Sequence, residues 1–319
     1  MTKTIVITGA TGAQGGGVVN ILLNTPGWEV RAVTRNPTSE KAKDLVARGV
    51  KIVQADVNDI VSLKNAFEGA HAIYGLTNFW EHLFTGKSQD EAGALEEEQG
   101  MNLARAAAQI PTLEHYIWST LPNAKKLSNG EAACAHLDYK ANVDERMRKD
   151  FPELAAKTTY LFFGFYPSNM AFLPMLKPVL VPDSGEKYVQ LLPTSENTPI
   201  QIAGDMTKTP GIWVRQILAN PKQCKGKYAM VATETLPMGS ILDIWSDVTG
   251  RKGYYTEISN KVYADLWGIG GAELYDQLKF GELVPDWITS YDLVSKEELG
   301  ITSEAPGCKL AFESLKPFL

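Results

Sequence analysis

Short apolar runs alternate with helical patterns over the first half of the chain. Runs rich in β-branched residues predict strands, and the segments between them repeat their apolar positions every three to four residues, which predicts helices. The expected strands lie near residues 4–8, 28–34, 50–54, 71–76, 114–119 and 158–163. The expected helices lie at residues 17–24, 41–48, 61–67, 94–109 and 137–149. This alternation predicts an α/β fold with a doubly wound parallel sheet.

The alternation stops after Phe163. Prolines interrupt the next thirty residues at positions 167, 174, 178, 182 and 193, so long regular helices are not expected there. We therefore expect a first domain over residues 1–163 and a smaller C-terminal α/β lobe over residues 164–319. The pattern leaves it open whether some segments of that lobe return to the sheet of the first domain.

Composition narrows the classes of protein that fit. The 319 residues carry a formal charge of −6, which argues against a nucleic-acid partner because phosphate backbones require a clustered basic face. The three cysteines have no paired spacing, so we expect reduced thiols and no metal site. No apolar run approaches the roughly 18 residues of a membrane span, and we expect a cytoplasmic protein without a membrane partner.

A glycine-rich turn follows the first expected strand. Gly9, Gly12 and Gly15 are spaced so that one permits a tight turn, one lets a pyrophosphate approach the backbone and one lets the following helix pack close to the strand. The helix N-terminus then faces the phosphates. This is the pattern of a Rossmann dinucleotide site. The residues expected to contact the cofactor here are Gly9, Thr11, Gly12, Ala13, Gln14 and Gly15.

The ends of the second and third strands bear on which dinucleotide binds. Arg35 stands where a protein selective for NAD usually has a carboxylate, and a cation suits the 2′-phosphate of NADP(H). Asp56 follows the third strand and is a candidate partner for the adenine amino group, with Val57 packed on the ring. Capping of the helix that begins near Asp59 is the alternative use of Asp56.

Several segments together resemble the NmrA-like family of atypical short-chain dehydrogenases/reductases, of the fungal type that acts in secondary metabolism. The resemblance rests on residues 9–15, 34–37, 55–57, 136–140 and 164–169, and it continues in 202–206, 226–227 and 249–252. It implies an NADP(H) domain and a small C-terminal substrate lobe that form a cleft over the nicotinamide. The family contains reductases and also redox-sensing regulators that bind NADP(H) without turning it over.

The wider superfamily places a Tyr-x-x-x-Lys motif on one helix face. The lysine holds the nicotinamide ribose and lowers the pKa of the tyrosine, which then acts as a proton donor. Lys140 matches the lysine, but His136 occupies the tyrosine position. Imidazole is a proton donor near neutral pH. His136 is therefore either a catalytic acid or a residue at a helix N-terminus without chemistry, and Tyr139 should point away from Lys140.

Two strand ends supply further candidates, because ligands of open α/β sheets sit at the C-terminal ends of strands. Ser119 ends the fifth strand, and Thr77 and Asn78 follow the fourth; we expect all three to contact the cofactor or the substrate. Glu81 and Tyr166 are further candidate acids. The aromatic residues expected to wall a pocket together are Phe79, Trp80, Phe84, Trp118, Phe163, Phe165 and Tyr166.

Three functions fit these features. The first is an NADPH-dependent biosynthetic reductase acting on a C=O, C=N or C=C bond of a bulky, aromatic small molecule. The second is a cofactor-assisted ring closure through an imine, of the Pictet-Spengler type, without obligatory net redox change. The third is a non-enzymatic NADP(H) sensor that binds a protein partner. We rank the enzymes first, with reduction as the default reaction.

Overall fold

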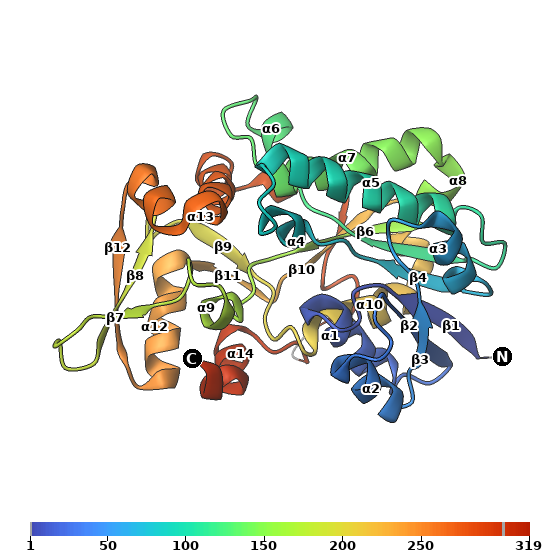
Figure 1. Ribbon diagram of the computed structural model, residues 1–319, viewed down its shortest axis with the longest axis horizontal. Helices are drawn as coiled ribbons and strands as arrows, with labels where there is room; N and C mark the ends of the chain where they lie inside the picture. The colour runs from blue at the N-terminus through green and yellow to red at the C-terminus, as the bar shows by residue number, and fades with distance from the viewer. Residues whose placement is uncertain (1, 302–303) are drawn as a thin grey trace.

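An eight-stranded parallel sheet forms the centre of the computed structural model, which describes residues 2–301 and 304–319 (Figure 1). Its spatial order is β13-β10-β6-β5-β4-β1-β2-β3. The strands are β1 (Lys3–Ile7), β2 (Trp28–Thr34), β3 (Lys51–Gln54), β4 (Ala72–Gly75), β5 (His115–Ser119), β6 (Thr158–Phe163), β10 (Tyr228–Val231) and β13 (Leu293–Val294).

Helices cover both faces of this sheet (Figure 1). One layer holds α1 (Ala13–Leu22), α2 (Glu40–Ala47) and α10 (Thr209–Ala219), and the other holds α3 (Ile60–Phe67), α5 (Gln89–Ala107) and α7 (Ala135–Asp150). Residues 5–7 of β1 form an unbroken apolar run because both faces of the strand are buried there: Val6 packs in the core on one side, and Ile5 and Ile7 pack on the other.

A second group of elements has its own core at the other end of the molecule (Figure 1). Strands β7 (Val179–Leu180), β8 (Lys187–Leu192) and β12 (Lys252–Glu257) form one small sheet, and β9 (Pro199–Ile202) pairs antiparallel with β11 (Glu234–Pro237). The helices of this group are α9 (Asn169–Phe172), α12 (Met238–Thr249), α13 (Asn260–Leu283) and α14 (Cys308–Leu315). Their buried contacts centre on Ile241, Trp245, Leu274 and Phe312.

Short helices complete the fold. They are α4 (Phe79–Leu83), α6 (Ala124–Leu127), α8 (Pro152–Ala155), α11 (Pro221–Cys224) and the 3-10 turns Trp287–Ser290 and Lys316–Phe318. Within residues 2–301 and 304–319, no helix has both the length and the apolar character that a bilayer span requires.

The α/β class and the doubly wound parallel sheet agree with the sequence prediction. All six expected strands are present, and each expected helix is present, although α5 begins at Gln89 rather than near residue 94. The early start has a local cause: the Ser88 hydroxyl accepts from the Glu91 N–H while the Glu91 carboxylate accepts from the Ser88 N–H, which is a capping box. Strands β10 and β13 lie after residue 163 and join the central sheet beside β6.

Candidate functional site

The glycine turn between β1 and α1 is built for a close approach of backbone atoms. Gly9 has a φ of 64°, in the left-handed region that favours glycine, and Gly12 is the N-cap of α1. A Cβ on Gly15 would collide with the Gly9 carbonyl, so the helix can pack this close to the strand only without a side chain there. A Cβ on Gly12 would meet its nearest atom, the Gly9 carbonyl oxygen, at an unstrained 3.4 Å. The packing therefore has room for a Cβ at position 12, and Gly12 lines the cavity in front of the helix N-terminus.

A cavity of about 810 Å³ opens at the C-terminal ends of β1, β2, β4, β5 and β6. Fourteen of the sixteen candidate residues from the sequence line it: Gly9, Thr11, Gly12, Ala13, Gln14, Arg35, Val57, Thr77, Asn78, Glu81, Ser119, His136, Lys140 and Tyr166. The other two are Gly15, which lies beneath the turn in α1, and Asp56. The cavity also takes in Leu274 and Gln277 from α13, so it lies between the two groups of elements.

Arg35 and Glu81 meet at one end of this cavity. The guanidinium Nη1 lies 2.7 Å from Glu81 Oε1, and both side chains are about half exposed. Arg35 directly follows β2, and Glu81 lies in α4, so the contact joins the end of a sheet strand to a short helix that also lines the cavity. The structure places Glu81 beside this arginine.

Asp56 makes a local turn in the structure. Its Oδ1 accepts hydrogen bonds from the backbone N–H of Asn58 at 2.9 Å and from the Asn58 side chain at 2.8 Å. Asp59 caps α3 itself through the Val61 N–H. The capping role that the sequence offered as the alternative use of Asp56 was therefore wrong, because Asp59 fills it. An adenine contact through Asp56 stays a prediction.

Lys140 lies in a buried ion pair on the floor of the cavity. Its Nζ is 2.7 Å from Glu96 Oε1 and donates to Thr77 Oγ1 at 3.0 Å. The Thr77 hydroxyl in turn donates to the same Glu96 oxygen at 2.9 Å. Glu96 Oε2 is buried and has no hydrogen-bond partner among the described residues. Tyr139 points the other way, toward Asp90, as expected from the helix geometry.

Gln14 links the glycine turn to the far end of the cavity. Its side-chain oxygen accepts from the hydroxyls of Tyr74 and Ser119, each at 2.8 Å, and its amide donates to the Tyr166 hydroxyl. Burial raises the pKa values of Tyr74 and Tyr166 above that of free tyrosine. Both phenols are therefore protonated near neutral pH, and a role of Tyr166 as an acid stays a prediction.

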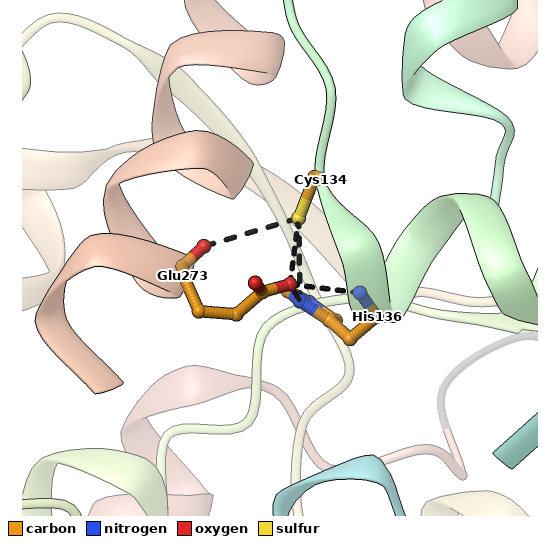
Figure 2. Close-up of side chains that lie close together, drawn as sticks. All are labelled: Cys134, His136 and Glu273. Carbon is orange, nitrogen blue, oxygen red and sulfur yellow. Dashed lines mark hydrogen bonds and ion pairs between the residues drawn. The ribbon is translucent and has the colours of Figure 1, made fainter. Parts of the chain in front are cut away.

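Residues of α13 contact both ring nitrogens of His136, and Figure 2 shows the contact with Glu273. Nδ1 lies 2.6 Å from Glu273 Oε1, and Nε2 lies 3.1 Å from Gln277 Oε1. The same Glu273 oxygen accepts from the His136 backbone N–H at 2.7 Å. On its open sides the ring packs against Phe79 and Trp80, with centroid distances of 5.6 Å and 5.3 Å.

The charges around His136 are set by Glu273, whose side chain is fully buried. Burial alone would raise the pKa of this carboxyl group, but hydrogen bonds from His136 and Gln89 and the charge of His136 outweigh it and lower the pKa to about 2. Burial, reinforced by the nearby carboxylates of Glu273 and Asp276, raises the pKa of the Cys134 thiol. At neutral pH the cluster therefore holds an ionised Glu273 and a protonated Cys134.

Comparison with known proteins identifies the family. The sequence model of the NmrA-like family matches residues 1–291. The chain belongs to the NmrA-like family. A Dictyostelium discoideum NmrA-like family domain-containing protein is 28% identical over 273 residues, covering 84% of this chain and 85% of its own. The Aspergillus hancockii NmrA-like family domain-containing oxidoreductase hkm9 is 28% identical over 298 residues, covering 88% and 82%.

Solved structures of NmrA-like proteins show the same fold. NmrA, a negative transcriptional regulator, in complex with NADP superposes with a TM-score of 0.79 at 22% identity, over 99% of this chain and 96% of that one. At this low sequence identity, the similarity shows a shared fold alone. It agrees with the Rossmann-type sheet that the glycine turn predicts.

The aromatic wall of this NmrA-like protein is smaller than the sequence suggested. Five of the seven expected residues line the cavity, namely Phe79, Trp80, Phe163, Phe165 and Tyr166. The expectation was wrong for Trp118, which is fully buried in the core and donates its indole N–H to Asp144. Neighbouring side chains on a strand point to opposite faces, and on β5 it is Ser119 that reaches the cavity. Phe84 was also misplaced: it is 57% exposed and stacks on the outside of Trp80.

Three functional candidates escaped the sequence analysis: Glu96, Glu273 and Gln277. Glu96 lies in an acidic run, which is typical of a solvent-exposed helix face. It is nevertheless four residues from each of the buried residues Ala92 and Gly100 and therefore lies on the same face of α5 as they do. That spacing was a usable signal. Glu273 and Gln277 lie about 140 residues after His136, and no local pattern connects them to it.

Proposed function

We propose that this protein is an NADP(H)-dependent biosynthetic reductase whose cofactor and substrate share the cavity described above. The observation that carries the proposal is the continuity of that cavity, which runs from the glycine turn through Arg35 to Lys140, His136 and an aromatic wall. NADP(H) complexes are known for the structural relative NmrA, and the relative hkm9 is named an oxidoreductase.

The residues present suit NADP(H). The open space before Gly12 and the N-terminus of α1 can take a pyrophosphate, and Arg35 offers a half-exposed cation for a 2′-phosphate. When bound, the cofactor supplies a hydride to the substrate. Lys140 would hold the nicotinamide ribose, with Ser119, Thr77 and Asn78 nearby, and His136 is the candidate proton donor.

The substrate we propose is a bulky, flat, aromatic molecule with a C=O, C=N or activated C=C bond. Apolar side chains, among them Trp80, Phe165 and Leu176, make up a large share of the cavity lining. The three cysteines are free and buried, which is compatible with the cytoplasmic location that we propose.

The test is incubation of the purified protein with NADPH and a panel of aromatic aldehydes, imines and enones. NADPH absorbance is followed, and products are identified by mass. A product two mass units heavier than its substrate, formed only with NADPH, supports reduction. A product of unchanged oxidation level that still needs the cofactor would favour ring closure through an imine. NADPH binding with no product would favour the sensor.

A further inference from the structure

The cluster of Cys134, His136 and Glu273 joins the start of α7 to α13 (Figure 2), and its His136 lines the cavity. Within the part of the chain that the structure describes, these three residues bring a thiol, an imidazole and a carboxylate within 4.8 Å of one another. Such a donor set could hold a metal ion or could move a proton. The distances between the donor atoms decide between the two.

The contact between His136 and Glu273 is a hydrogen bond and not an empty coordination site. Two donors bound to one Zn²⁺ at about 2.0–2.1 Å in tetrahedral geometry lie about 3.3 Å apart. Nδ1 and Oε1 are 2.6 Å apart, and the same oxygen already accepts the His136 backbone N–H. Cys134 completes the packing as a protonated thiol, 3.4 Å from the same oxygen. Hydrogen bonds from His136 and Cys134 to Glu273 therefore hold the three residues together without a metal ion.

We infer that Glu273 is the positioning residue that fixes and charges His136, so that the pair delivers the proton which a tyrosine delivers elsewhere in the superfamily. The carboxylate faces Nδ1 and the Gln277 oxygen faces Nε2. A carboxylate can only accept here, so Nδ1 is the nitrogen that donates to Glu273, and Nε2 is left as the nitrogen that exchanges the second proton. Gln277, which lines the cavity, can donate to Nε2 or accept from it, because its amide can turn.

Two further carboxylates lie near the ring. Besides Glu273, those of Asp276 on α13 and Asp138 on α7 interact electrostatically with His136, and the other contacts of the ring are the Gln277 amide, the neutral Cys134 and two aromatic rings. Burial raises the pKa values of Asp276 and Asp138, and hydrogen bonds offset it only in part. Glu273 is the one of these carboxylates that touches the ring.

The proposed step balances in protons and electrons, and it rests on the reductase function proposed above. For a substrate with a C=O or C=N bond, the carbon gains a hydride from NADPH, and the oxygen or nitrogen gains the proton from His136 Nε2. The Nε2–H bond breaks, the new O–H or N–H bond forms, and the imidazolium becomes neutral imidazole with Nδ1–H still bonded to Glu273. Gln277 can follow the change by turning its amide nitrogen toward Nε2. A proton from solvent then binds to His136 Nε2 and restores the imidazolium.

Titration of the histidine ring signals by NMR tests the inference without any substrate. The chain has only four histidines, so the His136 signals are identified by their loss in His136→Phe. Glu273→Gln keeps the size and the hydrogen-bond acceptor but removes the charge. We expect His136 to lose its second proton at a pH at least about one unit lower in this variant, because an opposite charge in contact is worth 1–3 units. Glu273→Asp should recover part of the shift.

Asp276→Asn is the matched control, since it removes a nearby carboxylate of α13 that does not touch the ring. We expect its shift to be clearly smaller than that of Glu273→Gln. Equal shifts in the two variants, or an unchanged titration in Glu273→Gln, would overturn the inference. Addition of Co²⁺ to the free protein gives a third readout: thiolate-to-metal absorption that disappears in Cys134→Ser and Glu273→Gln would make the cluster a metal site and also overturn it.

Kinetics with a compound that the panel shows to be reduced supplies the functional readout. His136→Phe should lower kcat by about a hundredfold or more, and Glu273→Gln by at least about tenfold, with the KM for NADPH unchanged in both. The double variant should be no slower than His136→Phe alone. Failure of every panel compound would count against the reductase proposal, whereas the NMR titration would still decide the role of Glu273.

Discussion

Lys140 and Glu96 form an almost wholly buried ion pair beside the cavity, with Nζ 2.7 Å from Oε1. Removing one partner leaves an uncompensated charge, which typically costs about 3–5 kcal/mol. We therefore expect Lys140→Met and Glu96→Gln each to lower the free energy of unfolding by an amount of this order, measured with urea. The double variant should be more stable than either single variant.

Variants of Lys140 and Glu96 also show whether Lys140 acts in catalysis or only in stability. If Lys140 holds the cofactor ribose, the stable double variant should still reduce substrate far more slowly than the wild-type protein, with a fall in kcat that exceeds any rise in the Kd for NADPH. Near-normal turnover by the double variant would mean that Lys140 serves only to neutralise Glu96.

Arg35 should set the preference for NADPH over NADH. A charge-assisted hydrogen bond contributes about 1.5–3 kcal/mol, so we expect at least about a tenfold preference, lost in Arg35→Ala. Glu81 competes for the same guanidinium across 2.7 Å, and an exposed pair of this kind contributes about 0–1 kcal/mol. Glu81→Gln should thus tighten NADPH binding up to about fivefold and leave NADH binding unchanged. Fluorescence titration measures both, and equal affinities in the wild-type protein would contradict the assignment of Arg35.

Gly12→Val should abolish cofactor binding and leave the fold largely intact. The protein itself has room at this position, since the nearest atom to an added Cβ is 3.4 Å away, but the new side chain would occupy the space proposed for the pyrophosphate. Circular dichroism and NADPH titration separate the two effects. Gly15→Val is the contrasting variant, because a Cβ there collides with the Gly9 carbonyl and should destabilise the protein. Retained NADPH binding in Gly12→Val would mean that the glycine turn serves only to pack α1 against β1 and does not bind the cofactor.

Asp144 should make stability depend on pH. It is buried beneath β5, where it accepts hydrogen bonds from Trp118, Thr120 and Tyr228. Burial raises its pKa to about 7, because those bonds and Arg148 offset only part of the penalty. The folded pKa is above the unfolded value of about 3.9, so the folded state holds the proton more tightly, and this contribution is lost as the pH rises from about 4 to 7.

Asparagine cannot ionise, so Asp144→Asn should not lose stability through this group as the pH rises. The free energy of unfolding of the wild-type protein should therefore fall by a few kcal/mol relative to the variant between pH 4 and pH 7, and the difference should level off above pH 7. Urea denaturation at a series of pH values gives the comparison. Parallel curves for the two proteins would show that Asp144 is ionised throughout.

The local features of the fold were predictable, and those that depend on distant segments were not. Strand β1 and the turn at Gly9 follow from a short apolar run and a glycine spacing, both of which are local patterns. Strand β13 has only two residues, Leu293 and Val294, and it forms because β10 offers an open edge. Nothing in so short a segment specifies its partner. The helix α4 was missed because its five residues, which include two large aromatics, resemble the end of a strand.

The candidate site shows the same division. Lys140 and His136 could be identified from their spacing on one helix face, and the cavity contains both. The sequence could not show that Glu273 faces His136, because α13 reaches it only through the packing of the second group of elements. Gly268, whose φ is 60°, interrupts α13 five residues before Glu273. Partners supplied across the fold in this way leave no signal in a single sequence.

The most direct test of the proposed function is the transfer of deuterium from NADPH labelled at C4 of the nicotinamide ring. The protein is incubated with each stereoisomer of the labelled cofactor and the panel of aromatic aldehydes, imines and enones, and products are examined by mass and NMR. Our account predicts a product that carries one deuterium on carbon from only one of the two stereoisomers, and a transfer rate that falls in Lys140→Met and His136→Phe. Tight NADPH binding without deuterium in any product would contradict it.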